Sequence, residues 1–258
     1  MKKVLSYGGG VQTFGMLVMI EKGILEKPDF AIFADTLAEY PETYHHIENV
    51  AKPIFERLNI PFIEVVEDKG IIEGYEKRNT IPMPGFRSCT ANFKVKPIHD
   101  YLRNIVGKDL IRKSRGKPLI ETWIGISTDE SSREVKREKQ TPKWVLQSYP
   151  LLEKDISRRQ IIEIIEKSGY EMPRKSGCFM CPYQGLKGFV LLKRDYQELY
   201  SIAVRMEELY FENRPSRRGG FLKDSGLKLK ELNEIPTLFS FVDELPSGSE
   251  CESGGCFL

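Results

Sequence analysis

The first half of the chain alternates between short apolar runs and longer segments in which apolar residues recur at helical spacing. Such runs predict buried strands, and the amphipathic segments predict helices. The expected strands are residues 3–7, 30–34, 60–66 and 120–126, and the expected helices are residues 11–23, 42–58 and 98–106. Strands that alternate with helices predict an α/β fold in which helices cover a parallel sheet. Ligands of such a sheet bind beyond the carboxyl ends of its strands.

Beyond residue 150 the pattern changes to helices and polar loops. Ser157 and Gln160 have the spacing of a capping box in front of an isoleucine-rich helix. Residues 171–188 are expected to form a loop, and residues 196–211 a further helix. The end of the chain is rich in glycine and serine, which predicts a flexible tail.

These changes divide the chain into three expected parts. Residues 1–150 form the sheet domain, residues 151–246 form a smaller helical region that carries a C-x-x-C loop, and residues 247–258 form the tail. A chain of 258 residues is long enough for one large domain with a small appendage.

Composition and charge narrow the possible partners and the compartment. The formal net charge is +2, so it gives no global signal for nucleic acid, although basic residues gather at 112–117, 133–143 and 214–218. No run approaches the ~20 apolar residues that a membrane span needs, and the first residues lack the pattern of a signal peptide. We expect a cytoplasmic protein with no membrane partner, whose five cysteines serve metal or redox chemistry rather than disulfides.

A glycine turn follows the first expected strand and leads directly into the first expected helix. Its sequence is Gly8-Gly9-Gly10-Val11-Gln12-Thr13. The backbone N–H groups of such a turn, and the free N–H groups and dipole of the helix start, favour phosphate binding. The turn is neither a Walker loop, which needs Gly-Lys-Ser/Thr, nor the G-x-G-x-x-G of dinucleotide folds. An ordinary strand-to-helix turn is the alternative interpretation.

Four further motifs follow the glycine turn along the chain. They are D-T-x-x-E-x-P-E-T at 35–43, C-T-x-x-F-K-x-x-P at 89–97, G-x-x-x-D-E-S-x-R at 125–133 and C-x-x-C-P-Y at 178–183. Each is weak alone, but the ordered set resembles the phosphoadenosine-phosphosulfate-reductase-like branch of the ATP pyrophosphatase superfamily. That branch includes DNA phosphorothioation ATP pyrophosphatases and phage homologues. The resemblance covers roughly two-thirds of the chain.

The resemblance implies that the glycine turn is a pyrophosphate loop. Gly8, Gly9, Gly10, Gln12 and Thr13 would then lie at the phosphates of ATP or another adenine nucleotide. The family writes this loop S-G-G-x-D-S, so the chain departs from it at Gly8, Gln12 and Thr13.

The resemblance also implies nucleotide contacts further along the chain. Asp35 and Thr36 follow the second expected strand, where an aspartate can accept hydrogen bonds from ribose hydroxyls or merely cap a loop. Lys94 and Lys96 are point charges suited to phosphate, although lysines more often lie on a solvated face, and Arg133 is suited to bidentate phosphate binding.

A magnesium ion is expected with ATP, but the sequence leaves more than one possible set of ligands for it. Gln12 replaces the aspartate of the family loop. The ion would therefore rely on Asp35, Asp129 or Glu130, or on the phosphates alone.

The cysteines allow three interpretations. In sulfur-inserting relatives, three cysteines hold a [4Fe–4S] cluster and leave one iron open for sulfide, and Cys89, Cys178 and Cys181 match that count. The second interpretation is zinc held by Cys178, Cys181, Cys251 and Cys256, and the third is a set of inert buried thiols.

The tail adds a different chemistry. Glu250-Cys251 resembles the Glu-Cys pair with which sulfonucleotide reductases attack a sulfonate, but the Gly and His that follow in the family are missing. Cys256 is placed to resolve a persulfide or sulfenate on Cys251. A tail with incidental cysteines is the alternative.

Three functions follow from these features. The first is an ATP pyrophosphatase that adenylates a target, expected to be DNA or RNA, for sulfur insertion from the cluster or a cysteine persulfide, with a cysteine desulfurase as partner. The second is a phosphoadenosine phosphosulfate reductase with Cys251 as nucleophile and thioredoxin as reductant. The third is a nucleotide-sensing or nucleic-acid-binding protein without catalysis, which the change at Gln12 leaves open.

Overall fold

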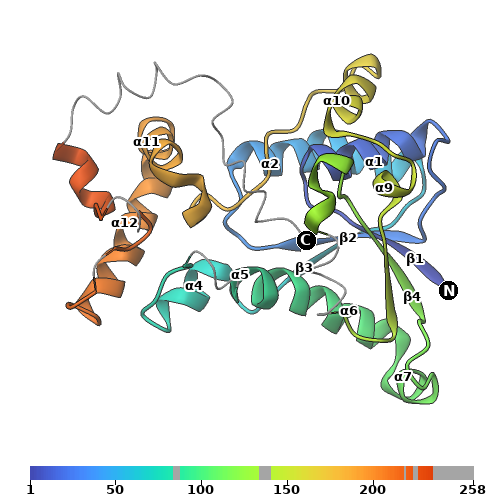
Figure 1. Ribbon diagram of the computed structural model, residues 1–258, viewed down its shortest axis with the longest axis horizontal. Helices are drawn as coiled ribbons and strands as arrows, with labels where there is room; N and C mark the ends of the chain where they lie inside the picture. Colours follow the sequence, from blue (N-terminus) through green and yellow to red (C-terminus); the bar gives the residue numbers. More distant parts are fainter. Residues whose placement is uncertain (84–87, 134–140, 218, 223–225, 235–258) are drawn as a thin grey trace.

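The computed structural model describes residues 1–83, 88–133, 141–217, 219–222 and 226–234. Within these residues five parallel strands form one sheet in the order β3-β2-β1-β4-β5 (Figure 1). The strands are β1 (Lys2–Ser6), β2 (Phe30–Asp35), β3 (Phe62–Val66), β4 (Ile120–Ile124) and β5 (Val145–Ser148). The predicted α/β fold with a parallel sheet is confirmed. The edge strand β5 is an element that the sequence pattern did not predict.

Helices cover the two faces of the sheet. On one face lie α1 (Val11–Glu21), α10 (Arg158–Lys167) and a helical stretch over residues 41–57, and on the other lies α6 (Lys96–Val106) (Figure 1). The helix α1 is buried from Val11 to Ile20, because α10 covers it on the side away from the sheet. A Cβ atom built on Gly15 would lie 2.2 Å from the Ile161 Cγ2 atom, so glycine permits this close packing. The core around α1 thus extends beyond residue 150, and the expected domain boundary at that residue stays a prediction.

Two π-helical turns interrupt the helices that flank the sheet. The stretch over residues 41–57 consists of α2 (Pro41–His46), the π turn η1 (Ile47–Ala51) and α3 (Lys52–Arg57), and a second π turn, η2 (Ala91–Val95), leads into α6. Each turn is followed by a helix with proline at its second position, Pro53 or Pro97. Proline has no N–H group for the helical hydrogen-bond ladder, and a wider turn absorbs the missing bond.

A second, mainly helical layer packs beside the sheet. The helices α11 (Gly185–Asp195) and α12 (Gln197–Glu212) share an apolar cluster with α4 (Gly70–Glu76), at the left of Figure 1. The expectation of a loop as far as residue 188 is wrong, because α11 already begins at Gly185. The expected helix over residues 196–211 is confirmed as α12, and the capping box of Ser157 and Gln160 is present at the start of α10.

Short helical segments connect these parts. They are α5 (Ser88–Thr90), α7 (Lys108–Lys113), η3 (Thr128–Arg133), α9 (Pro150–Glu153), η5 (Pro182–Gln184) and η6 (Leu229–Glu234). Among the described residues, no helix is long and apolar enough to cross a membrane.

Candidate nucleotide and cysteine site

The strand order creates a crevice at the carboxyl ends of β1 and β4. The chain moves from β1 to β2 on one side and reaches β4 on the other, so the loops after β1 and β4 diverge. Parallel sheets bind ligands at such a point of reversal. The glycine turn follows β1 and residues 125–130 follow β4, so two of the predicted motifs flank the same crevice.

The glycine turn has the backbone of a phosphate loop. Gly9 has φ of +70°, a value that favours glycine, and Gly10 is the extended residue that precedes α1. The helix α1 begins at Val11, so the N–H groups of Val11, Gln12 and Thr13 have no acceptor within the helix. The Thr13 hydroxyl accepts the Gly8 N–H at 3.2 Å and donates to the Gly10 carbonyl at 3.2 Å, which closes the turn.

Two glycines let neighbouring segments approach this turn. A Cβ atom on Gly125 would lie 2.9 Å from Thr13 Cγ2, and one on Gly10 would lie 2.7 Å from Ser176 Oγ. The Ser176 side chain is buried, and its hydroxyl has no hydrogen-bond partner within the described part of the chain. Few buried hydroxyl groups in folded proteins lack a partner, so this contact marks an unusual point of the loop.

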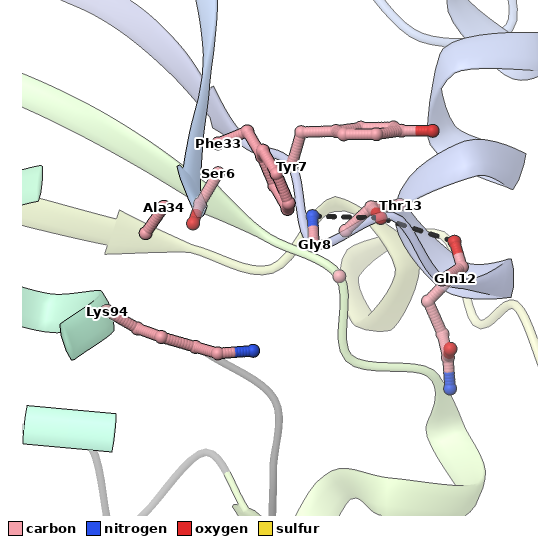
Figure 2. A pocket seen from close by; sticks show the side chains of 10 residues that line it. Ser6, Tyr7, Gly8, Gln12, Thr13, Phe33, Ala34 and Lys94 are labelled. Carbon is pink, nitrogen blue, oxygen red and sulfur yellow. Dashed lines mark hydrogen bonds between the residues drawn. The ribbon is translucent and has the colours of Figure 1, made fainter. Parts of the chain in front are cut away.

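A pocket opens in front of the glycine turn, and we refer to it below as the phosphate pocket. Figure 2 shows Gly8, Gln12 and Thr13 on its wall and the Lys94 side chain reaching toward it from η2. The other lining residues are Ser6, Tyr7, Gly10, Phe33, Ala34 and Gly125. Backbone N–H groups, a hydroxyl and one ammonium group therefore share a concave space, which is the chemistry that phosphate requires.

Gln12 bridges a carboxylate and a guanidinium at the edge of this pocket. Its amide nitrogen donates to Glu130 Oε2 at 3.3 Å, and its carbonyl oxygen accepts from Arg158 Nη1 at 3.4 Å. The structure thus brings Glu130 to the phosphate loop, as a magnesium ligand would require. Asp129 instead accepts the Arg158 backbone N–H at 2.6 Å and caps the start of α10.

Asp35 and Thr36 lie at the end of β2 but have different neighbours. Asp35 Oδ1 accepts the Leu37 N–H at 2.8 Å and the Tyr44 hydroxyl at 2.7 Å, and burial raises the pKa of Asp35 above its ordinary value despite these bonds. Thr36 does not line the phosphate pocket: its hydroxyl lies 3.2 Å from Cys178 Sγ. The structure therefore places Thr36 beside the cysteines.

Of two other predicted basic residues, Lys96 does not line the pocket, and the structure does not describe the side chain of Arg133. Lys96 is half exposed and pairs with Glu67 at 2.5 Å and Asp100 at 3.3 Å. The backbone of Arg133 ends η3, but its side chain lies outside what the structure describes, so its phosphate role stays a prediction.

The three cysteines predicted to hold a cluster all line a second pocket, which we refer to below as the cysteine pocket. Cys89 comes from α5, and Cys178 and Cys181 come from the loop before η5, although about ninety residues separate these segments. The rest of the lining is largely apolar and consists of Thr36, Ile71, Pro82, Met83, Thr90, Lys94, Met180, Pro182 and Tyr183. Lys94 therefore lines the phosphate pocket and the cysteine pocket.

A buried carboxylate, Glu39, contacts residues that line the two pockets. Its side chain accepts hydrogen bonds from Lys94 Nζ at 3.1 Å and from the Gly177 N–H at 2.8 Å. The Cys178 Sγ atom lies 3.9 Å from Glu39 Oε1. Backbone pairing of Glu39 with Cys178 fixes the cysteine loop to the segment after β2, and the Phe179 N–H donates to the Ala38 carbonyl at 2.9 Å.

The donor set of the cysteine pocket suits a soft metal centre. Thiolates select iron–sulfur clusters and zinc, and three half-buried thiols line this pocket. In the described part of the chain, no three His, Cys, Asp or Glu side chains are arranged to hold a single metal ion. A cluster places its cysteines on separate irons and so does not need them around one point. Three thiols that line one pocket are compatible with a cluster, and the cluster stays a prediction.

The remaining predicted site residues, Cys251 and Cys256, lie outside the described residues. Their nucleophilic or resolving roles stay predictions, as does the zinc set that includes them.

Sequence reasoning missed Glu39, Ser176 and Arg158. Glu39 stands within the D-T-x-x-E motif and Ser176 stands just before C-x-x-C, so both carried a positional signal. Glu39 contacts Lys94, 55 residues away along the chain, and the Arg158 guanidinium contacts Gln12, 146 residues away, and no local pattern predicts such contacts.

Two of the basic clusters are far apart. The residues at 112–117 begin within α7 (Lys108–Lys113) and residue 214 comes shortly after α12 (Gln197–Glu212), and α7 and α12 lie at opposite sides of Figure 1. They do not form one polyanion-binding face.

Comparison with known proteins supports the predicted resemblance. Residues 2–115 match the family model of the phosphoadenosine phosphosulfate reductase domain. This region contains the glycine turn, the segment after β2 and the C-T-x-x-F-K motif. No curated protein sequence matches the chain.

The solved structures that are similar to the chain include the following two. Phosphoadenylyl-sulfate reductase from Candida auris, in a phosphate complex, has 15% identity and a TM-score of 0.45, over 67% of this chain and 75% of its own. The U34-tRNA thiolase NcsA from Methanococcus maripaludis, with its [4Fe-4S] cluster, has 17% identity and a TM-score of 0.40, over 81% of this chain and 72% of its own. The matched family and both structures are named for enzymes.

Proposed function

We propose that the protein is an ATP pyrophosphatase that activates a nucleic acid for sulfur insertion. The observation that carries the proposal is Lys94, whose side chain lines the phosphate pocket and the pocket of the three cysteines. A nucleotide bound at the glycine turn would lie next to thiols, and an enzyme that joins adenylation to sulfur transfer needs that proximity.

The phosphate loop would carry the first step. An oxygen of the target attacks the α-phosphorus of ATP, the bond to the β-phosphate oxygen breaks, and pyrophosphate leaves while the target becomes an adenylate. The free N–H groups of α1, its dipole and Lys94 would stabilise the charge that develops on the leaving pyrophosphate. Glu130, held beside the loop by Gln12, is the carboxylate best placed to assist a magnesium ion.

The cysteines would supply the second step. When a [4Fe–4S] cluster is bound by Cys89, Cys178 and Cys181, it supplies an iron that is open to sulfide. Without a cluster, the terminal sulfur of a cysteine persulfide attacks the activated atom and AMP leaves; a second thiol then releases the thiolated product as a disulfide forms, and a dithiol such as thioredoxin reduces it. A cysteine desulfurase would provide the sulfur.

The family match favours a second candidate function, a phosphoadenosine phosphosulfate reductase. In that reaction the Cys251 thiolate attacks the sulfonate sulfur, adenosine 3′,5′-bisphosphate leaves, and a dithiol releases sulfite. The reductase needs the tail but does not need the cysteine pocket.

A product assay separates the two functions. Anaerobic protein is incubated with magnesium and ATP, with and without RNA or DNA, and separately with phosphoadenosine phosphosulfate and thioredoxin. We expect AMP and pyrophosphate from ATP, which Lys94→Met diminishes and Cys251→Ala leaves unchanged. Sulfite release that Cys251→Ala abolishes, with no AMP from ATP, would assign the reductase instead.

A further inference from the structure

A buried ion pair stands between the phosphate pocket and the cysteine pocket. The Glu39 side chain has no exposed surface, and that of Lys94 is 12% exposed. Lys94 Nζ lies 3.1 Å from Glu39 Oε1, and the other carboxylate oxygen, Oε2, accepts the Gly177 N–H at 2.8 Å. A carboxylate this deeply buried needs such partners to be tolerated in its ionised form.

Among the described residues that line the phosphate pocket, Lys94 is the only lysine. The negative charge of Glu39 largely offsets the positive charge that Lys94 brings to the pocket. Figure 2 shows the Lys94 side chain directed at the space before the glycine turn, so an entering phosphate meets this ammonium group. The same phosphate also meets the field of Glu39, because buried charges are poorly screened. Glu39 therefore opposes the attraction that Lys94 provides.

We propose that Glu39 is a positioning residue that fixes the Lys94 ammonium group and limits how tightly the pocket holds polyphosphate. The inference rests on the proposed nucleotide site and adds a regulation of its affinity. Pyrophosphate is a small, highly charged product, and a loop built only to attract it would release it slowly. A buried counter-charge beside the attracting lysine keeps pyrophosphate exchangeable while Lys94 stays correctly placed.

The substitution Glu39→Gln tests the proposal because it removes the charge and keeps an acceptor for the Gly177 N–H. Binding of inorganic pyrophosphate and of magnesium–ATP is measured by calorimetry on the full chain. We expect Glu39→Gln to bind pyrophosphate about tenfold more tightly than the natural protein, which corresponds to about 1.4 kcal/mol. A residue that only supported the fold would, on removal, loosen binding.

A double-mutant cycle separates the effects of the two charges. Lys94→Met alone should weaken pyrophosphate binding, because it removes the attracting ammonium group and leaves the Glu39 carboxylate without its counter-charge. In that background Glu39→Gln should still tighten binding, because it removes the repelling charge. Glu67→Gln is the matched control, because it removes the carboxylate beside the exposed Lys96 and should leave affinity unchanged.

Each outcome decides a separate point. If Glu39→Gln is unfolded alone, pyrophosphate should restore its circular dichroism, since the anion replaces the missing counter-charge; failure to do so overturns the inference. Equal or weaker binding by folded Glu39→Gln also overturns it. If the natural protein binds neither pyrophosphate nor ATP, the proposed function itself is wrong.

Discussion

The contact between the glycine turn and the cysteine loop predicts a measurable coupling between Gly10 and Ser176. In Gly10→Ala the new Cβ would lie 2.7 Å from Ser176 Oγ, closer than real Cβ atoms approach, but 3.6 Å from Ser176 Cβ, an ordinary contact. Overpacking of this kind costs about 1–3 kcal/mol. The backbone adds no strain, because φ at Gly10 is −103°. We therefore expect Gly10→Ala to lower the free energy of unfolding by about 1–3 kcal/mol.

Removing the hydroxyl should remove the clash. In the Ser176→Ala background, Gly10→Ala should cost only the weaker capping by alanine, a loss that is the same in both backgrounds and cancels in a double-mutant cycle. Ser176→Ala alone should be neutral or stabilising, because it deletes a buried hydroxyl without a partner in the described structure. Gly8→Ala is the control, since its Cβ would have its nearest neighbour at 4.0 Å. Urea denaturation gives the four free energies. An equal cost of Gly10→Ala in both backgrounds would refute the predicted contact.

Two further substitutions test the helical parts by urea denaturation. Ser157→Ala should lower stability by about 1 kcal/mol, because the Ser157 hydroxyl accepts the Gln160 N–H at the start of α10, and no loss would contradict the observed cap. Glu207→Gln should cost about 1–3 kcal/mol, since the N–H groups of Phe221 and Leu229 donate to different oxygens of the buried carboxylate, and the amide replaces one of these oxygens with an NH2 group. Burial raises the pKa of Glu207 above the ordinary 4.5, so this group favours the folded state most below that pH and less as pH rises through the folded pKa. Glu207→Gln should flatten that part of the pH profile, and an unchanged profile would contradict the assignment.

Much of the sheet region could be predicted from the sequence because its local signals agree. The apolar run of β2 is buried along its length, and the glycine turn joins β1 to α1 as its composition predicts. The capping box marks the start of α10 for the same reason, since its hydrogen bonds are local.

The elements that were missed have weak local signals. The edge strand β5 has the sequence Val-Leu-Gln-Ser, which is too short and too mixed in polarity to predict a strand. The helix α11 begins with two glycines in four residues, which disfavours a helix. Pairing with β4 stabilises β5, and the apolar cluster around Phe189 stabilises α11. Tertiary contacts decide both.

The sequence predicted many residues of the candidate site, but it did not predict how they are arranged. The motifs contained Lys94 and the three cysteines, which the fold brings to adjoining pockets. The same motifs also contained Lys96, which pairs with surface carboxylates instead. Spacing along a chain does not say which side of a helix faces the site when, as here, a π turn shifts the helical phase.

The central claim is that Cys89, Cys178 and Cys181 form one centre beside the nucleotide. Anaerobic purification of the natural protein, Cys89→Ala and Cys256→Ala, with a visible spectrum and analysis of iron, acid-labile sulfide and zinc, tests it most directly. The account predicts broad absorbance near ~400 nm with iron and sulfide in the natural protein and in Cys256→Ala, and their loss in Cys89→Ala. Zinc that Cys256→Ala removes, or iron and sulfide that persist in Cys89→Ala, would contradict it.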